Sequence, residues 1–147
     1  MAPSTDDHPA RRADGDVTIG AEGDRHLGRR ARLERILVRD GPSCVWCRRP
    51  VDVALVAATT EHVIPRVKGG PSWLENEVAA CRRCNGRRGH RSPSSWADEC
   101  EQLGWEPDRA RLVAVLESLT ARIEQQGGQR RARPYLAAQL RRLKRSL

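Results

Sequence analysis

Two pairs of cysteines are the residues of this chain with the most evident chemistry. Cys44 and Cys47 form one C-x2-C pair, and Cys81 and Cys84 form a second pair, with 33 residues between the two pairs. Two intervening residues let a tight turn direct both thiolates at one ion, and two such turns supply tetrahedral sulfur ligation that suits Zn²⁺. Four thiolates leave no ligand position for a substrate, so the sequence predicts a structural zinc.

Polar residues between and beside the cysteine pairs could do the chemistry that this zinc cannot. His62 follows an acidic residue, Glu61, and precedes a loop rich in Pro and Gly, 64-IPRVKGGPSW-73. An unperturbed imidazole has a pKa of about 6.5, which suits a general base near neutral pH. Asn76 opens the segment that returns to the second cysteine pair, and Asn85 directly follows that pair.

These residues follow the pattern C-x2-C…[D/E]-H-x2-P-x3-G-G…N-x4-C-x2-C-[H/N], which resembles the HNH endonuclease family over about residues 44–89. The resemblance implies that His62 takes a proton from the water that attacks a phosphodiester. It implies that Glu61 and Asn85 hold one catalytic cation, Mg²⁺ or Mn²⁺, and that Asn76 anchors the loop that carries the histidine. The family most often has Asp before the histidine, so Glu61 implies altered metal geometry or ligation through a water molecule.

Phosphodiester hydrolysis independently needs a base, a water molecule and positive charge near the phosphate. A hard cation on oxygen ligands supplies such charge, and basic side chains can bind the flanking phosphates. The residues expected to contact nucleic acid in this way are Arg66, Lys68, Arg82, Arg83, Arg87 and Arg88.

The overall charge favours an anionic partner. The net charge is +8, and the segment 130–147 has seven basic residues and no acidic one. We expect double-stranded DNA, with other nucleic acids and RNA cleavage left open. No apolar run is long enough to cross a bilayer, no secretory signal is evident, and paired cysteines suit a reducing compartment, so a cytoplasmic protein is expected.

Two functional classes therefore compete. The first is a metal-dependent DNA endonuclease that nicks or cuts both strands. The alternative is a zinc-stapled nucleic-acid-binding protein without catalysis, which the Glu in place of Asp favours and which the retained His62, Asn76 and Asn85 oppose.

The elements that must position these residues indicate an α+β fold. We expect a small ββα-metal core stapled by a four-cysteine zinc site, with an N-terminal helix and a C-terminal helical extension. Residues 1–26 lack periodicity and are expected to be disordered, residues 27–91 should form the nuclease domain, and residues 92–147 the helical extension with its basic tail. Ser92 and Pro93 favour the start of a helix, and Gly41 the end of one.

Overall fold

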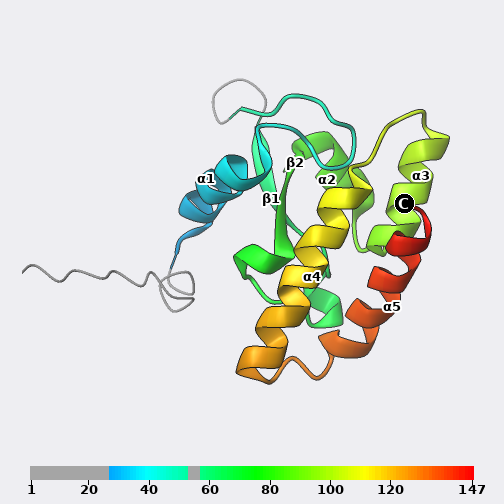
Figure 1. The fold of residues 1–147 in the computed structure, drawn as a ribbon. Coiled ribbons are helices and arrows are strands. Elements are labelled where there is room, and N and C mark those ends of the chain that lie inside the picture. The colour runs from blue at the N-terminus through cyan, green and yellow to red at the C-terminus, as the bar shows by residue number, and fades with distance from the viewer. Residues whose placement is uncertain (1–26, 53–56) are drawn as a thin grey trace, which may run out of the picture.

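The computed structural model describes residues 27–52 and 57–147. The segment 1–26, for which the sequence predicts disorder, lies outside the described residues. Within the described ranges the chain forms five α-helices and a two-stranded antiparallel sheet (Figure 1), which confirms the expected α+β class.

The sheet consists of β1 (Ala58–His62) and β2 (Glu77–Cys81). Its register places His62 opposite Glu77 and Ala58 opposite Cys81. All five residues of β2 are buried, so this strand belongs to the interior of the protein. Helix α2 (Arg82–Arg88) follows β2 without a connecting loop and contacts both strands, which completes the ββα arrangement.

Helix α1 (Arg29–Asp40) lies on one side of the sheet and also contacts both strands (Figure 1). Leu33 and Ile36 are its buried residues. The helix ends as its sequence predicts: Gly41 has φ 84°, and its N–H donates to the carbonyl of Leu37. Glycine tolerates this positive φ without the steric cost of a Cβ.

Three further helices lie on the other side of the sheet from α1 (Figure 1): α3 (Pro93–Gln102), α4 (Arg109–Gln126) and α5 (Ala132–Arg145). Helix α5 packs against α3 and α4, and α4 also contacts the short 3₁₀ turn η3 (Leu74–Asn76) that precedes β2.

The helix start at Ser92 is confirmed, because its side chain accepts a hydrogen bond from the backbone N–H of Ser95 and Pro93 is the first helical residue. Leu136 and Leu143 of α5 are buried, so the basic tail is an amphipathic helix docked on the rest of the protein. Lys144 of this helix pairs with Glu117 of α4 at 2.6 Å.

The chain has no phenylalanine, and three tryptophans supply large aromatic side chains in or against the core. Trp46 and Trp96 have exposed fractions of 0% and 1%. Trp96 contacts Trp46 and Trp105 edge to face, at ring-centroid distances of 6.4 and 6.2 Å. Such edge-to-face pairs stabilise a core beyond the area that they bury.

None of the helices in the described ranges has the length and apolar content of a membrane span.

Candidate active site

The four cysteines of the two C-x2-C pairs come together. Cys44 and Cys47 lie in the turn after α1, Cys81 ends β2 and Cys84 is in the first turn of α2. Their sulfur atoms all lie within 4.8 Å of one another. This set could bind a structural zinc, as expected, and a zinc there would join the turn after α1 to the sheet and α2.

One thiol of this set, that of Cys44, is biased towards the thiolate form, whereas the pKa values of Cys47 and Cys84 are raised, mainly by burial for Cys47 and by hydrogen bonding to Cys44 for Cys84. Hydrogen bonding from the Cys84 thiol is the main cause that lowers the pKa of Cys44 to about 5, against the opposing effect of burial. A thiolate is the ligand form of cysteine. Burial raises the pKa of the fifth cysteine, Cys100 on α3, to about 12, so this thiol is protonated and lies outside the zinc set.

His62 is the last residue of β1 and lies at one wall of a cleft of about 380 Å³. Its Nε2 lies 2.9 Å from Ser72 Oγ and 3.5 Å from Glu77 Oε1. Burial, followed by the charge of Arg66, lowers the pKa of His62 to about 4. The imidazole is therefore neutral near pH 7, which is the form that accepts a proton.

Asn76 fixes the loop that follows the histidine. Its amide donates to the carbonyls of Ile64 and Pro71 at 3.0 and 2.9 Å, and its Oδ1 accepts from the Ile64 N–H at 2.8 Å. Gly70 makes this close packing sterically feasible, since a Cβ there would lie 1.8 Å from the Ile64 carbonyl oxygen. These contacts are the ones that an anchoring role for Asn76 requires.

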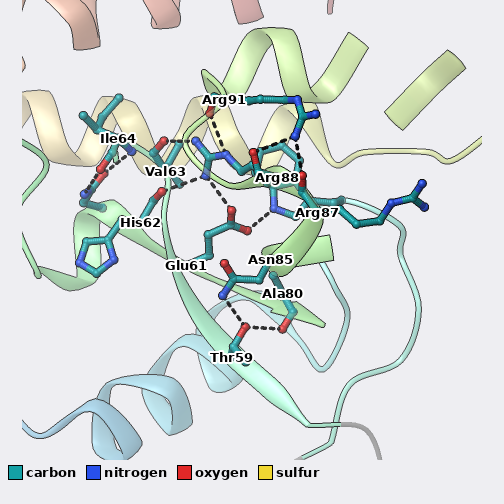
Figure 2. A network of polar contacts seen from close by, with 12 residues as sticks. Thr59, Glu61, His62, Val63, Ile64, Ala80, Asn85, Arg87, Arg88 and Arg91 are labelled. Carbon is teal, nitrogen blue, oxygen red and sulfur yellow. Dashed lines mark hydrogen bonds and ion pairs between the residues drawn. The ribbon is translucent and has the colours of Figure 1, made fainter. Parts of the chain in front are cut away.

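Glu61, which the resemblance implies is a ligand to the catalytic cation, is buried and bonded inside the protein. Its exposed fraction is 5%. The Trp46 indole N–H donates to its Oε2. The Arg88 guanidinium donates to its Oε1 at 2.9 Å (Figure 2). Burial is the main cause that raises the pKa of Glu61, and the charge of Arg88 opposes it.

Arg88 lies in the interior rather than on the surface where a phosphate contact was expected. Its exposed fraction is 1%, and it also donates to the backbone carbonyls of His62, Val63 and Arg91 (Figure 2). Arg88 thus connects α2 to the end of β1, and its charge balances that of the buried Glu61.

Asn85 lies in α2 beside Glu61, and both residues line the same cleft as His62 (Figure 2). Its Nδ2 donates to Thr59 Oγ1 at 2.9 Å, so its carbonyl oxygen is the atom available to a ligand. Each Glu61 oxygen has a second lone pair beyond the bonds to Trp46 and Arg88. These oxygen donors fit a hard divalent cation such as Mg²⁺, which commonly takes one or two protein ligands and several waters.

The cleft contains the expected base and the expected cation ligands, and arginines from three parts of the chain also line it. The imidazole of His62 is turned away from the Glu61 carboxylate, as expected for successive residues of a strand (Figure 2). The cleft residues are Arg29, Arg32, Thr60, Glu61, His62, Pro65, Arg66, Ser72, Asn85, Arg88, Gly89 and His90.

The other basic residues expected to bind nucleic acid lie outside this cleft. Arg82 is exposed and lines a neighbouring hollow. The guanidinium groups of Arg83 and Arg87 lie 4.5 and 5.5 Å from the ring centroid of Trp105, and Lys68 lies 5.7 Å from that of Tyr135. These side chains are exposed, so they stay accessible to a phosphate backbone.

Three functional candidates were missed from the sequence. Arg29 and Arg32 reach the cleft from α1, and Glu77 reaches the histidine from β2. The pairing of the two strands could have pointed to Glu77, because the last residue of one strand faces the first residue of the other. No sequence signal shows which arginines of α1 face the sheet, because this helix has arginine on several faces.

The ββα arrangement lies beside four clustered cysteines that could bind a structural zinc and beside the cleft that contains His62. Residues 44–100, called the HNH domain below, match the model of the HNH endonuclease family. The match excludes α1, α4 and α5. No curated protein and no solved structure matches the chain significantly.

Proposed function

We propose that this protein is a metal-dependent endonuclease that hydrolyses the phosphodiester backbone of DNA. The observation that supports it best is the neutral His62 imidazole in a cleft that Asn85 and four arginines also line, within an HNH domain. A general base, oxygen ligands for a cation and binding groups for phosphate are the parts that such a reaction needs.

Each of the four side chains His62, Asn76, Asn85 and Glu61 has a separate role in this reaction. His62 takes a proton from the attacking water, and Asn76 holds its loop in place through four hydrogen bonds to the backbone between Val63 and Pro71. Asn85 and Glu61 would hold the divalent cation, with Asn85 the more accessible of the two. When bound, the cation supplies positive charge for the pentavalent phosphorus and the leaving oxygen.

One observation favours a second candidate function, a zinc-stapled nucleic-acid-binding protein without catalysis. Both oxygens of Glu61 are already bonded inside the protein, to Trp46 and to Arg88. A carboxylate held in this way has less capacity for a cation. The net charge of +8 supports nucleic-acid binding under either function.

A plasmid cleavage assay separates these two functions. We expect the purified protein to convert supercoiled plasmid to nicked or linear DNA with Mg²⁺ or Mn²⁺, and EDTA added after brief preincubation to stop the reaction. Parallel reactions with single-stranded DNA and structured RNA define the substrate. Tight DNA binding without cleavage under either cation would contradict the endonuclease and support the binding protein.

We also expect Arg29 of α1 to contact substrate phosphate. Its Nε donates to Thr60 Oγ1 at 3.1 Å, which places the exposed guanidinium at the cleft. Replacing Arg29 with alanine should weaken DNA binding about 3- to 10-fold for every sequence, and should reduce the slope of log affinity against log salt by about one. Fluorescence anisotropy at several salt concentrations measures both quantities.

Arg30 is the matched control for this prediction. Its side chain is 83% exposed, pairs with Glu34 at 3.5 Å and is absent from the cleft wall. Arg30→Ala removes the same charge from the same helix, so an equal loss of affinity and slope in both variants would rule out a specific contact by Arg29.

A further inference from the structure

A buried carboxylate lies behind the proposed base. Glu77 has an exposed fraction of 0%. Its Oε2 accepts a hydrogen bond from Arg32 Nε at 2.7 Å. Its Oε1 has no hydrogen-bond partner among the described residues and lies 3.5 Å from His62 Nε2. A charged atom without a partner at such a depth is costly, so its position beside the histidine needs a reason.

The fold holds this carboxylate in place from two sides. The register of the sheet pairs His62 with Glu77 directly. Helix α1 supplies Arg32, whose side chain is only 15% exposed and balances the charge of Glu77. Strand pairing and the mostly buried Arg32 side chain therefore fix both the position and the orientation of the Glu77 carboxylate.

This geometry determines which of the two ring nitrogens of His62 carries the proton. A carboxylate only accepts hydrogen bonds, whereas the hydroxyl of Ser72, 2.9 Å from Nε2, can donate or accept. An unprotonated Nε2 would direct its lone pair at a buried negative charge, which is unfavourable at this distance. A protonated Nε2 is attracted by Glu77 and can donate to Ser72, and it leaves the lone pair on Nδ1.

We propose that Glu77 is a positioning residue that holds His62 with its proton on Nε2, so that Nδ1 is the atom that accepts a proton. The proposal rests on the endonuclease function proposed above. In the reaction, an O–H bond of water breaks and its proton moves to Nδ1 while the water oxygen bonds to phosphorus. The bond from phosphorus to the leaving oxygen then breaks, and that oxygen takes a proton from solvent. The role resembles that of an acidic residue that orients a catalytic histidine in other hydrolases.

The test replaces Glu77 with glutamine, whose amide can donate as well as accept and therefore no longer selects one tautomer. We expect kcat for plasmid cleavage to fall about 10- to 100-fold, with KM and DNA affinity within about twofold of wild type. Glu77→Asp retains the negative charge and should recover part of kcat. Glu75→Gln is the control, since it removes a neighbouring carboxylate that pairs with Arg122 at 2.5 Å instead of facing the histidine.

A second readout does not depend on activity. In protein labelled with ¹⁵N in the imidazole rings, NMR at one fixed pH should show His62 as the Nε2–H tautomer in wild type and as a mixture in Glu77→Gln. If Glu77→Gln no longer melts cooperatively, the double variant Arg32→Gln/Glu77→Gln takes its place in the same measurements. The double variant removes both buried charges.

Three outcomes overturn the proposal: unchanged kcat in Glu77→Gln, a loss expressed in KM alone, or the same tautomer in wild type and variant. A wild-type protein that cleaves nothing would contradict the endonuclease function instead, and the NMR comparison would still decide whether Glu77 sets the tautomer.

Discussion

Replacing His62 with alanine is expected to lower the rate of DNA cleavage by about 10²- to 10⁴-fold, the range that a positioned general base contributes. The reason is that the His62 imidazole at the cleft wall is neutral near pH 7, since burial and the charge of Arg66 lower its pKa to about 4. Single-turnover cleavage of supercoiled plasmid at saturating protein measures this rate without interference from product release.

The fold should survive this substitution. The His62 side chain is 20% exposed, contacts Ser72 and Glu77 and is not part of the hydrophobic core, so its removal leaves that core unchanged. Melting temperature, metal content and DNA affinity should therefore stay close to wild type. His90→Ala is the matched control, because this exposed histidine lines the same cleft. Equal cleavage rates in wild type and His62→Ala would rule out His62 as the base.

Removing one of the four clustered cysteines should have an equally large effect, on the stability of the fold rather than on the cleavage step. We expect Cys84→Ser to lose tightly bound zinc and cooperative melting. The four sulfurs join the turn after α1, the end of β2 and the start of α2. A structural zinc contributes about 10–16 kcal/mol in small domains, which is comparable with or greater than the roughly 5–15 kcal/mol that stabilises a typical protein.

Cys100→Ala provides the control for this prediction. Cys100 is a buried cysteine that lies outside the metal set, so its variant should retain one zinc per chain. Elemental analysis and circular dichroism on heating measure the two properties. Folded, metal-free Cys84→Ser that melts like wild type would show that the cysteine cluster does not need an ion.

Features with a local sequence signal were predictable. Spacing predicted the cysteine cluster, and the pattern after His62 predicted the loop that Asn76 anchors. Gly41 and Ser92 predicted helix boundaries, because the left-handed backbone and the capping hydroxyl act on adjacent residues.

Features that depend on tertiary packing were not predictable in the same way. The sequence suggested that Arg88 contacts phosphate and that Glu61 faces a cation, yet the two form a buried ion pair. The local sequence around an arginine in a basic motif does not indicate whether its guanidinium faces solvent or the interior. The contributions of Arg29 and Arg32 depend on how α1 packs against the sheet, and periodicity does not specify that rotation when arginines surround a helix.

The salt bridge between Arg32 and Glu77 has a consequence for engineering. Its two partners lie on opposite sides of the boundary of the family match, since α1 precedes residue 44. Transplanting only the HNH domain into another protein would remove the counter-ion of Glu77 and uncover the face of the sheet that α1 contacts. A portable HNH domain derived from this chain should therefore include α1.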